Sequence, residues 1–73
     1  MLIGEISKGE KDRIRISIEN FKGNNYVDIR VYFENDKGEW VPTKKGVTIP
    51  PEKVDEFREI VTQAQAALKE VNR

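Results

Sequence analysis

The feature that most constrains this chain is the stretch from residue 21 to residue 49, in which two runs of alternating apolar residues are separated by turn residues. The runs are Tyr26–Phe33 and Glu39–Ile49, and the polar segment Asn35–Gly38 lies between them. Alternation with a period of two is typical of strands with one buried face, and short connections rich in Asn and Gly are typical of hairpins. The stretch therefore predicts an antiparallel hairpin.

Two further strand patterns precede this hairpin. Residues Arg13–Glu19 alternate strictly, with three isoleucines on one face, and a weaker strand is expected at Leu2–Ser7. If the strand continues, Phe21 falls by parity on the polar face together with Arg15. Such an aromatic suits base stacking, although a Phe folded over the edge of the sheet fits the pattern equally. The connection at residues 22–25 is expected to be a turn, since Gly and Asn accept positive φ.

The same parity argument divides the later strands. Arg30 shares the polar face of its strand, whereas Phe33 is expected in the core unless a bulge turns it. Pro42 has no N–H for a ladder, so the last strand is expected at an edge or a bulge. Gly46 is expected where the backbone bends or approaches a neighbour closely. Asp28, the acid at the centre of a strand, is expected to pair with a neighbouring arginine.

The C-terminal third predicts one helix that begins around Pro50–Glu52 and runs to about Val71, because Pro suits the first helical position and Glu suits the positive end of the dipole. Its apolar residues recur every three or four positions and form one stripe: Val54, Phe57, Ile60, Val61, Ala64, Leu68 and Val71. A helix of about 21 residues is ~30 Å long, whereas strands of 5–8 residues make a sheet of ~17–27 Å. We expect the helix to overhang its own sheet and a second copy to cover the far end. A helix that runs diagonally over its own sheet is the alternative.

Composition excludes several classes of protein. The 73 residues have room for one domain, and the chain contains neither Cys nor His, so self-association is the remaining way to stabilise so small a core. Net charge is zero, with nine bases against seven acids between residues 8 and 46, so any attraction for nucleic acid must come from a local stripe. Without His or Cys, general acid–base catalysis would need carboxylates or Lys, and we expect no enzyme, no metal and no cofactor.

The sequence also bears on location. No apolar run approaches the ~18 residues of a transmembrane helix. The apolar start at residues 1–3 is too short for a signal sequence. We therefore expect no membrane partner and a cytoplasmic protein, nucleoid-associated if its source is prokaryotic.

An ordered set of short pieces resembles the single-stranded-DNA-binding domain of the positive cofactor four family of transcriptional coactivators. The pieces are Phe21-Lys22-Gly23, Asp28-Ile29-Arg30, Tyr32-Phe33 (where the family has Trp in place of Phe), Gly38-Glu39, Pro42 and Lys44-Lys45-Gly46-Val47-Thr48-Ile49. They follow one another without a gap, and the match covers roughly residues 12–72. The resemblance implies a single α+β domain over residues 1–73: a curved four-stranded antiparallel sheet followed by one long helix (ββββα), in a dimer whose helices pack together.

The resemblance also implies site residues. The family positions that face nucleic acid fall on Phe21, Lys22, Arg30, Phe33 and Lys45, with Lys44 beside them, and the polar-face pattern adds Arg15. The expected dimer-interface residues are Phe57, Val61, Ala64, Leu68 and Val71. Asn24 and Val41 stand where animal members carry lysines, which predicts weaker affinity. A lone domain without the long Ser- and Lys-rich arm of the animal proteins resembles the microbial members.

Together these observations predict a homodimer that binds single-stranded nucleic acid with little sequence preference, in transcription regulation or genome maintenance. Phosphates would be neutralised by the basic side chains, and bases would stack on Phe21 and on Phe33 or Trp40. A Trp is more typical of a core or a dimer interface than of a stacking site, so the role of Trp40 stays open. Whether the ligand is DNA or RNA also stays open. The resemblance implies a partner in the transcription machinery. The alternative is a protein-interaction module without direct nucleic-acid contact, which the neutral net charge favours.

Overall fold

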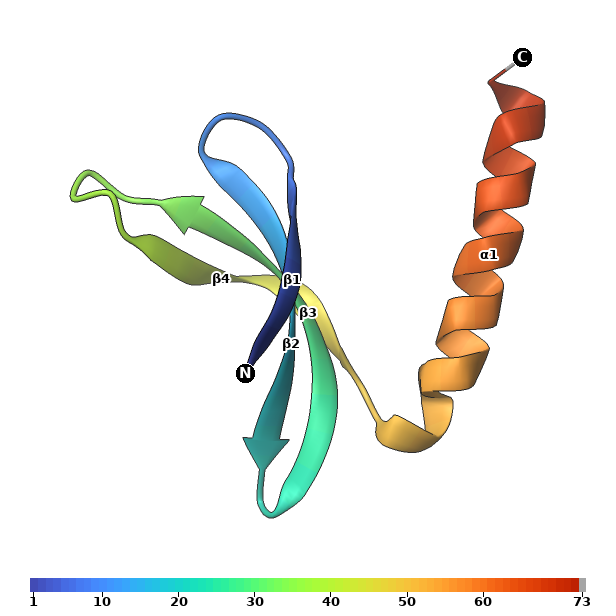
Figure 1. Cartoon of the computed structure of the whole chain (residues 1–73), viewed down its shortest axis with the longest axis horizontal. Coiled ribbons are helices and arrows are strands. Elements are labelled where there is room, and N and C mark those ends of the chain that lie inside the picture. Colours follow the sequence, from blue (N-terminus) through green and yellow to red (C-terminus); the bar gives the residue numbers. More distant parts are fainter. Residues whose placement is uncertain (73) are drawn as a thin grey trace.

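The computed structural model describes residues 1–72 and consists of one antiparallel sheet, in the order β1-β2-β3-β4, followed by a helix (Figure 1). The predicted α+β class and ββββα order are confirmed. The bounds are β1 Leu2–Ser7, β2 Asp12–Phe21, β3 Asn24–Glu34, β4 Trp40–Ile49, a short 3-10 turn η1 at Pro51–Lys53, and α1 Val54–Val71.

The hairpin between β2 and β3 is tighter than the sequence predicts. Only Lys22 and Gly23 connect the strands, with φ of 54° and 82°, and Asn24 already pairs with Phe21. Two consecutive residues at positive φ match the right-handed twist of a hairpin. The expected four-residue turn with Asn at positive φ was therefore wrong, and the two strands stay paired to their tips.

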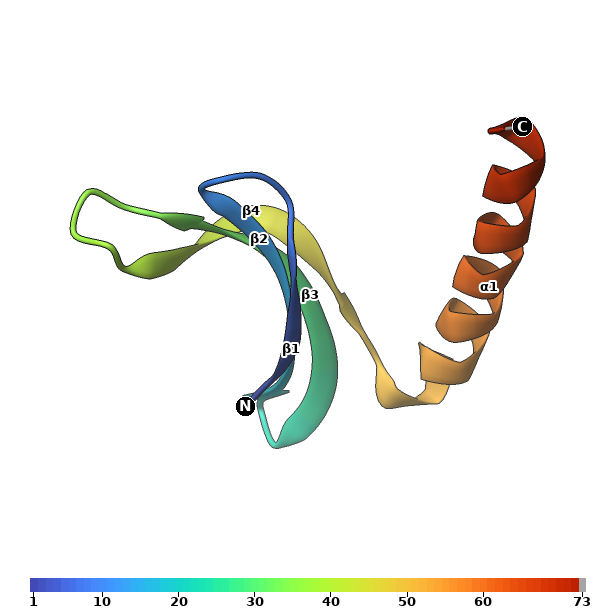
Figure 2. The ribbon, with the colours of Figure 1, turned by 45° about the horizontal axis from the view of Figure 1, so that its top comes forward.

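The register divides the sheet into two faces. On one face, which we call the apolar face, Ile14 lies opposite Val31, and the row continues through Ile16, Ile18, Val27, Ile29, Val47 and Ile49. On the other, which we call the polar face, Arg15 lies opposite Arg30 and the next pair along is Ser17 and Asp28. The sheet is curved (Figure 2). This is the separation that strict alternation in β2 and β3 predicts.

The helix α1 stands away from the sheet in both views (Figures 1 and 2). None of its residues is buried, and only Val54 at its start is half-buried. Both expectations for a helix lying on its own sheet, overhanging or diagonal, were therefore wrong. The radius of gyration is 14.4 Å, against about 11 Å expected for a compact domain of this length. No apolar side chain of residues 1–72 is buried, so both the helix stripe and the apolar face remain uncovered.

Candidate nucleic-acid interface

The centre of the polar face is organised by an ion pair within β3. Arg30 donates from Nε to Asp28 Oδ2 at 3.1 Å and from Nη2 to Asp28 Oδ1 at 3.0 Å, so the guanidinium fork is bidentate. Its Nη1 donates to the Thr43 carbonyl at 3.0 Å. The hydrogen bond to Asp28 raises the pKa of Arg30, although partial desolvation opposes the shift. Arg30 is thus held in one orientation, and the predicted pairing of Asp28 with an arginine is confirmed.

A glycine makes room for this arginine. Gly46 lies opposite Arg30, and a Cβ at residue 46 would come within 2.6 Å of the Ile29 carbonyl oxygen and 3.0 Å of Arg30 Cζ. Real Cβ atoms do not approach backbone so closely. The close approach predicted for Gly46 is confirmed, and it explains why the guanidinium can extend past β4 to the Thr43 carbonyl.

The basic pair Lys44–Lys45 lies on a bulge of the edge strand β4. Between the partners Pro42 and Gly46, β4 has three residues where β3 has only Val31. Thr43 closes the bulge, because its Oγ1 donates to the Val31 carbonyl at 2.8 Å and accepts from the Lys45 N–H at 3.1 Å. Both lysines are exposed, and neither has an ion-pair partner within residues 1–72. Their charges are available to an external anion.

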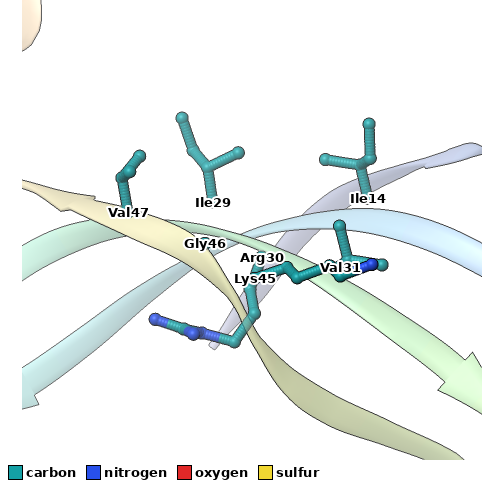
Figure 3. Close-up of a pocket in the computed structure, with 7 residues that line it drawn as sticks. All are labelled: Ile14, Ile29, Arg30, Val31, Lys45, Gly46 and Val47. Atoms are coloured by element: carbon teal, nitrogen blue, oxygen red, sulfur yellow. The ribbon is translucent and has the colours of Figure 1, made fainter.

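Figure 3 shows how these side chains divide between the two faces. Ile14, Ile29 and Val47 point to one side of the sheet, and Arg30 points to the other. Lys45 lies beside Val31, and with the apolar residues it lines a shallow hollow. The structure therefore places Lys45 at the margin of the two faces and not in the row of Arg15 and Arg30.

Phe21 ends the polar face at the tip of the β2–β3 hairpin. Its side chain is 64% exposed, and Lys22 Nζ lies 5.4 Å from the ring centroid. Phe21 lies on the same face as Arg15, because the two residues are six positions apart in β2, a distance of about 20 Å. The sequence left open whether Phe21 is exposed on the polar face or folded over the edge of the sheet. The structure shows an exposed aromatic ring with a cation beside it.

Phe33 lies at the other end of the sheet. It pairs with Asp12 and Val41 and has the parity of Val31, so it belongs to the side of the apolar face. It is 41% exposed, so the core position expected for it is not observed in the single chain. The structure does not bring Phe33 together with Phe21.

One group of side chains was predicted only in part: Arg15 and Trp40 were named as candidates, whereas Glu5, Arg13 and Tyr32 were not. Arg13 Cζ lies 4.3 Å from the centroid of Trp40, and Arg15 Cζ lies 4.9 Å from Tyr32 and 5.9 Å from Trp40. Glu5 accepts hydrogen bonds from both arginines. Arg15 Nε donates to Glu5 Oε1 at 3.0 Å, and Arg13 Nη1 donates to Glu5 Oε2. We call these five residues the Glu5 cluster. Trp40 thus lies on the polar face and not in a core.

The charge state of Glu5 follows from this geometry. Partial desolvation acts to raise the pKa of the carboxyl group, but the hydrogen bonds from Arg15 and Arg13 and their positive charges outweigh it. The pKa of Glu5 therefore lies below its ordinary value of 4.5. At neutral pH the cluster contains one carboxylate shared by two guanidinium groups.

The predicted dimer-interface residues form an uncovered stripe along α1. Phe57 is 37% exposed, Val61 50%, Leu68 55% and Val71 76%, and Ala64 is also exposed. Within the single chain nothing packs against them, and the dimer remains a prediction.

Two other features are absent from residues 1–72. No helix there is both long enough and apolar enough to cross a membrane. No group of three or more acidic side chains is arranged to hold a metal ion in this part of the chain.

Comparison with known proteins gives a family match. The family model described as Transcriptional Coactivator p15 (PC4) matches residues 8–60, from the start of the β1–β2 turn into α1. The transcriptional coactivator KELP of Arabidopsis thaliana is 33% identical over 60 residues, which are 82% of this chain and 36% of that protein. This chain therefore spans about a third of the length of that curated relative.

Solved structures with the same fold are also similar in sequence. BPSL1147, described as a PC4 homolog from Burkholderia pseudomallei, is 32% identical, with a TM-score of 0.85 over 89% of this chain and 88% of that one. MoSub1 in complex with DNA is 27% identical, with a TM-score of 0.64 over 96% of this chain and 86% of that one. MoSub1 has also been solved with single-stranded DNA.

Proposed function

This chain belongs to the transcriptional coactivator p15 (PC4) family, and on that premise we propose that it binds single-stranded nucleic acid on the polar face of its sheet. The observation that carries the proposal is the exposed ring of Phe21 on the same face as Arg15 and Arg30. An aromatic platform in line with cations is what unpaired bases and their phosphates require. The complexes of MoSub1 with DNA support it. The process served would be transcription regulation or genome maintenance, in the cytoplasm or on the nucleoid.

The proposed mechanism divides the work between stacking and charge. Stacking of a base on Phe21 contributes about 1–3 kcal/mol and tolerates any sequence. Lys22, Lys44 and Lys45 have no ion-pair partner among the described residues, so they would contact phosphates first. Three phosphates neutralised on a single strand correspond to a slope of about −2 for log affinity against log salt. Arg30 adds less, because Asp28 already balances its charge. No step of this mechanism is catalytic.

We propose further that the binding species is a homodimer. The apolar stripe of α1 is exposed from Phe57 to Val71, and the chain is more extended than a compact domain of its size. A second copy offers the matching apolar surface, and an uncovered stripe of this length is unfavourable in water. The residues proposed to be covered are Phe57, Val61, Ala64, Leu68 and Val71.

Two substitutions test the division between stacking and charge. Phe21→Ala should weaken binding of a labelled single-stranded oligonucleotide by about 1–3 kcal/mol with little change in salt slope. Lys45→Ala should weaken binding to all sequences and flatten the slope by about 0.7. Lys69→Ala, on α1, is the matched control for loss of one positive charge. Fluorescence anisotropy over a salt series measures both quantities.

A protein-interaction module is the second candidate, and the pairing of Arg15 and Arg30 with acids favours it, because those cations are partly neutralised. It predicts weak binding to any nucleic acid and no effect of Phe21→Ala. If Lys45→Ala and Lys69→Ala change the slope equally, the binding is attraction to scattered lysines, and the proposed face is wrong.

A further inference from the structure

A carboxylate lies at the centre of the cationic part of the polar face. Glu5 projects from β1 directly opposite Arg15, and its two oxygens are divided between Arg15 Nε, at 3.0 Å, and Arg13 Nη1. The family match begins at residue 8, so β1 and this glutamate lie outside it. Within the described residues, Glu5 is the only acid that bridges two arginines.

Aromatic rings hold the same two arginines from another side. Arg13 stacks over Trp40, with 4.3 Å from Cζ to the ring centroid, and Arg15 lies 4.9 Å from the centroid of Tyr32. Guanidinium groups held against aromatic rings are arranged for a nucleotide, because a base stacks on the ring or the guanidinium plane while the phosphate meets the N–H donors. The Glu5 cluster thus contains both parts of a nucleotide site, with an internal anion already in it.

The Glu5 carboxylate resembles the backbone phosphate that it would exclude from this cluster. A carboxylate and a phosphodiester each carry one negative charge on two terminal oxygens, and the guanidinium fork binds both with the same geometry. The Glu5 side chain is 30% exposed, and those of Arg13 and Arg15 are 37% and 22% exposed. Ion pairs at this exposure are weak, so an incoming phosphate can displace the carboxylate into water.

We propose that the Glu5 cluster is a second nucleotide subsite, in which the Glu5 carboxylate stands where a backbone phosphate binds. The inference rests on the proposed function and extends it. Arg15 lies opposite Arg30, so the subsite adjoins the row that leads to Phe21 and can take a continuation of the same strand. Because one anion replaces another, occupancy of this subsite adds little to the salt dependence of the unmodified protein. The glutamate limits affinity at one end of the face.

The test is Glu5→Gln, which keeps the shape of the side chain and removes its charge. Two guanidinium groups are then free for phosphates, so we expect single-stranded oligonucleotide to bind about three- to tenfold more tightly. The salt slope should become steeper by about 0.7 for each phosphate gained. Glu10→Gln, in the β1–β2 turn, changes net charge equally and is the matched control, because Glu10 makes no ion pair within residues 1–72. Circular dichroism checks that both variants fold.

Trp40 supplies a local measurement, since it is the single Trp of the chain. Oligonucleotide at the subsite should quench its fluorescence, and quenching and anisotropy should titrate together, at lower concentration in Glu5→Gln than in Glu10→Gln. Anisotropy that reports binding while Trp40 fluorescence is unchanged would overturn the subsite and leave the proposed function standing. Weaker binding by Glu5→Gln would also overturn it, because Glu5 would then be orienting the arginines for the strand. Absence of binding by all three proteins would overturn the proposed function and the subsite together.

Discussion

The sheet and the helix differ in how far their side chains find partners within one chain. In the sheet, no buried side-chain N or O atom among the described residues lacks a hydrogen-bond partner, and the arginines of the polar face are held by acids and rings. In the helix, no side chain is buried and no side chain caps the N-terminus. Within the described residues the buried polar side chains are therefore satisfied by groups of the same chain, whereas the apolar surfaces of the sheet and the helix are left uncovered.

This difference indicates what each region depends on. Hydrogen bonds and ion pairs organise the sheet but contribute only modestly to net stability, whereas burial of apolar surface is the main favourable term in folding. Within residues 1–72 no apolar side chain is fully buried, so this term is incomplete in the single chain, and we expect the proposed second copy to supply the rest. The geometry of the polar face is thus set within the chain, and stability is expected to come from association.

The largest effect should come from a charge on the helix stripe. Leu68→Asp places a carboxylate where the proposed partner packs, and we expect a monomer, an unfolded chain or both. Ala66→Asp adds the same charge on the opposite side of the helix and should leave the dimer intact. Sedimentation velocity and circular dichroism measure the outcome. A stable folded monomer of the unmodified protein would show that the helix needs no partner.

A smaller effect is expected from crowding the sheet. Gly46→Ala forces a Cβ to within 2.6 Å of the Ile29 carbonyl, so β4 must shift away from β3. We expect a loss of about 1–3 kcal/mol in the free energy of unfolding. Gly4→Ala is the control, because its Cβ would meet nothing within 4 Å, and it should change stability by less than about 0.5 kcal/mol. Equal effects in urea unfolding would mean that Gly46 is not a packing requirement.

The smallest effect concerns the pH dependence of Glu5. Its pKa is lower in the folded protein than in the unfolded chain, so its ion pairs stabilise the fold at pH above the ordinary value of 4.5. That contribution is lost as pH falls through the lowered pKa. The difference in unfolding free energy between the unmodified protein and Glu5→Gln should therefore shrink as the solution is acidified below pH 4.5. A difference independent of pH would show that the carboxylate is not paired in solution.

Much of the sheet could be predicted from the sequence because strand patterns carry their own geometry. Alternation in β2 and β3 set the two faces, Pro42 indicated the edge, and Gly46 indicated the close approach. The position of the helix could not be predicted, since a stripe shows which side is apolar and not what covers it. The two-residue turn was missed because Lys22 adopts a positive φ that long side chains rarely take.

The site was predicted only in part. Phe21, Arg15 and Arg30 share a face because parity within a paired hairpin is enough to place them. The side occupied by Trp40 depends on the length of the β3–β4 turn, which pairs it with Glu34. Glu5 requires the register of β1 as well, which the β1–β2 turn sets by pairing Ser7 with Arg13. Neither can be derived from alternation alone.

The most direct test of the central claim is a titration of the unmodified protein with labelled single-stranded DNA and with duplex DNA of the same length, at the same salt concentration. Unpaired bases can stack on Phe21, and bases inside a duplex cannot, so we predict tighter binding to the single strand. The net charge of zero sharpens the comparison, because bulk charge does not concentrate DNA on this protein. Equal and weak affinity for the two forms, unchanged by Phe21→Ala, would contradict binding at the polar face.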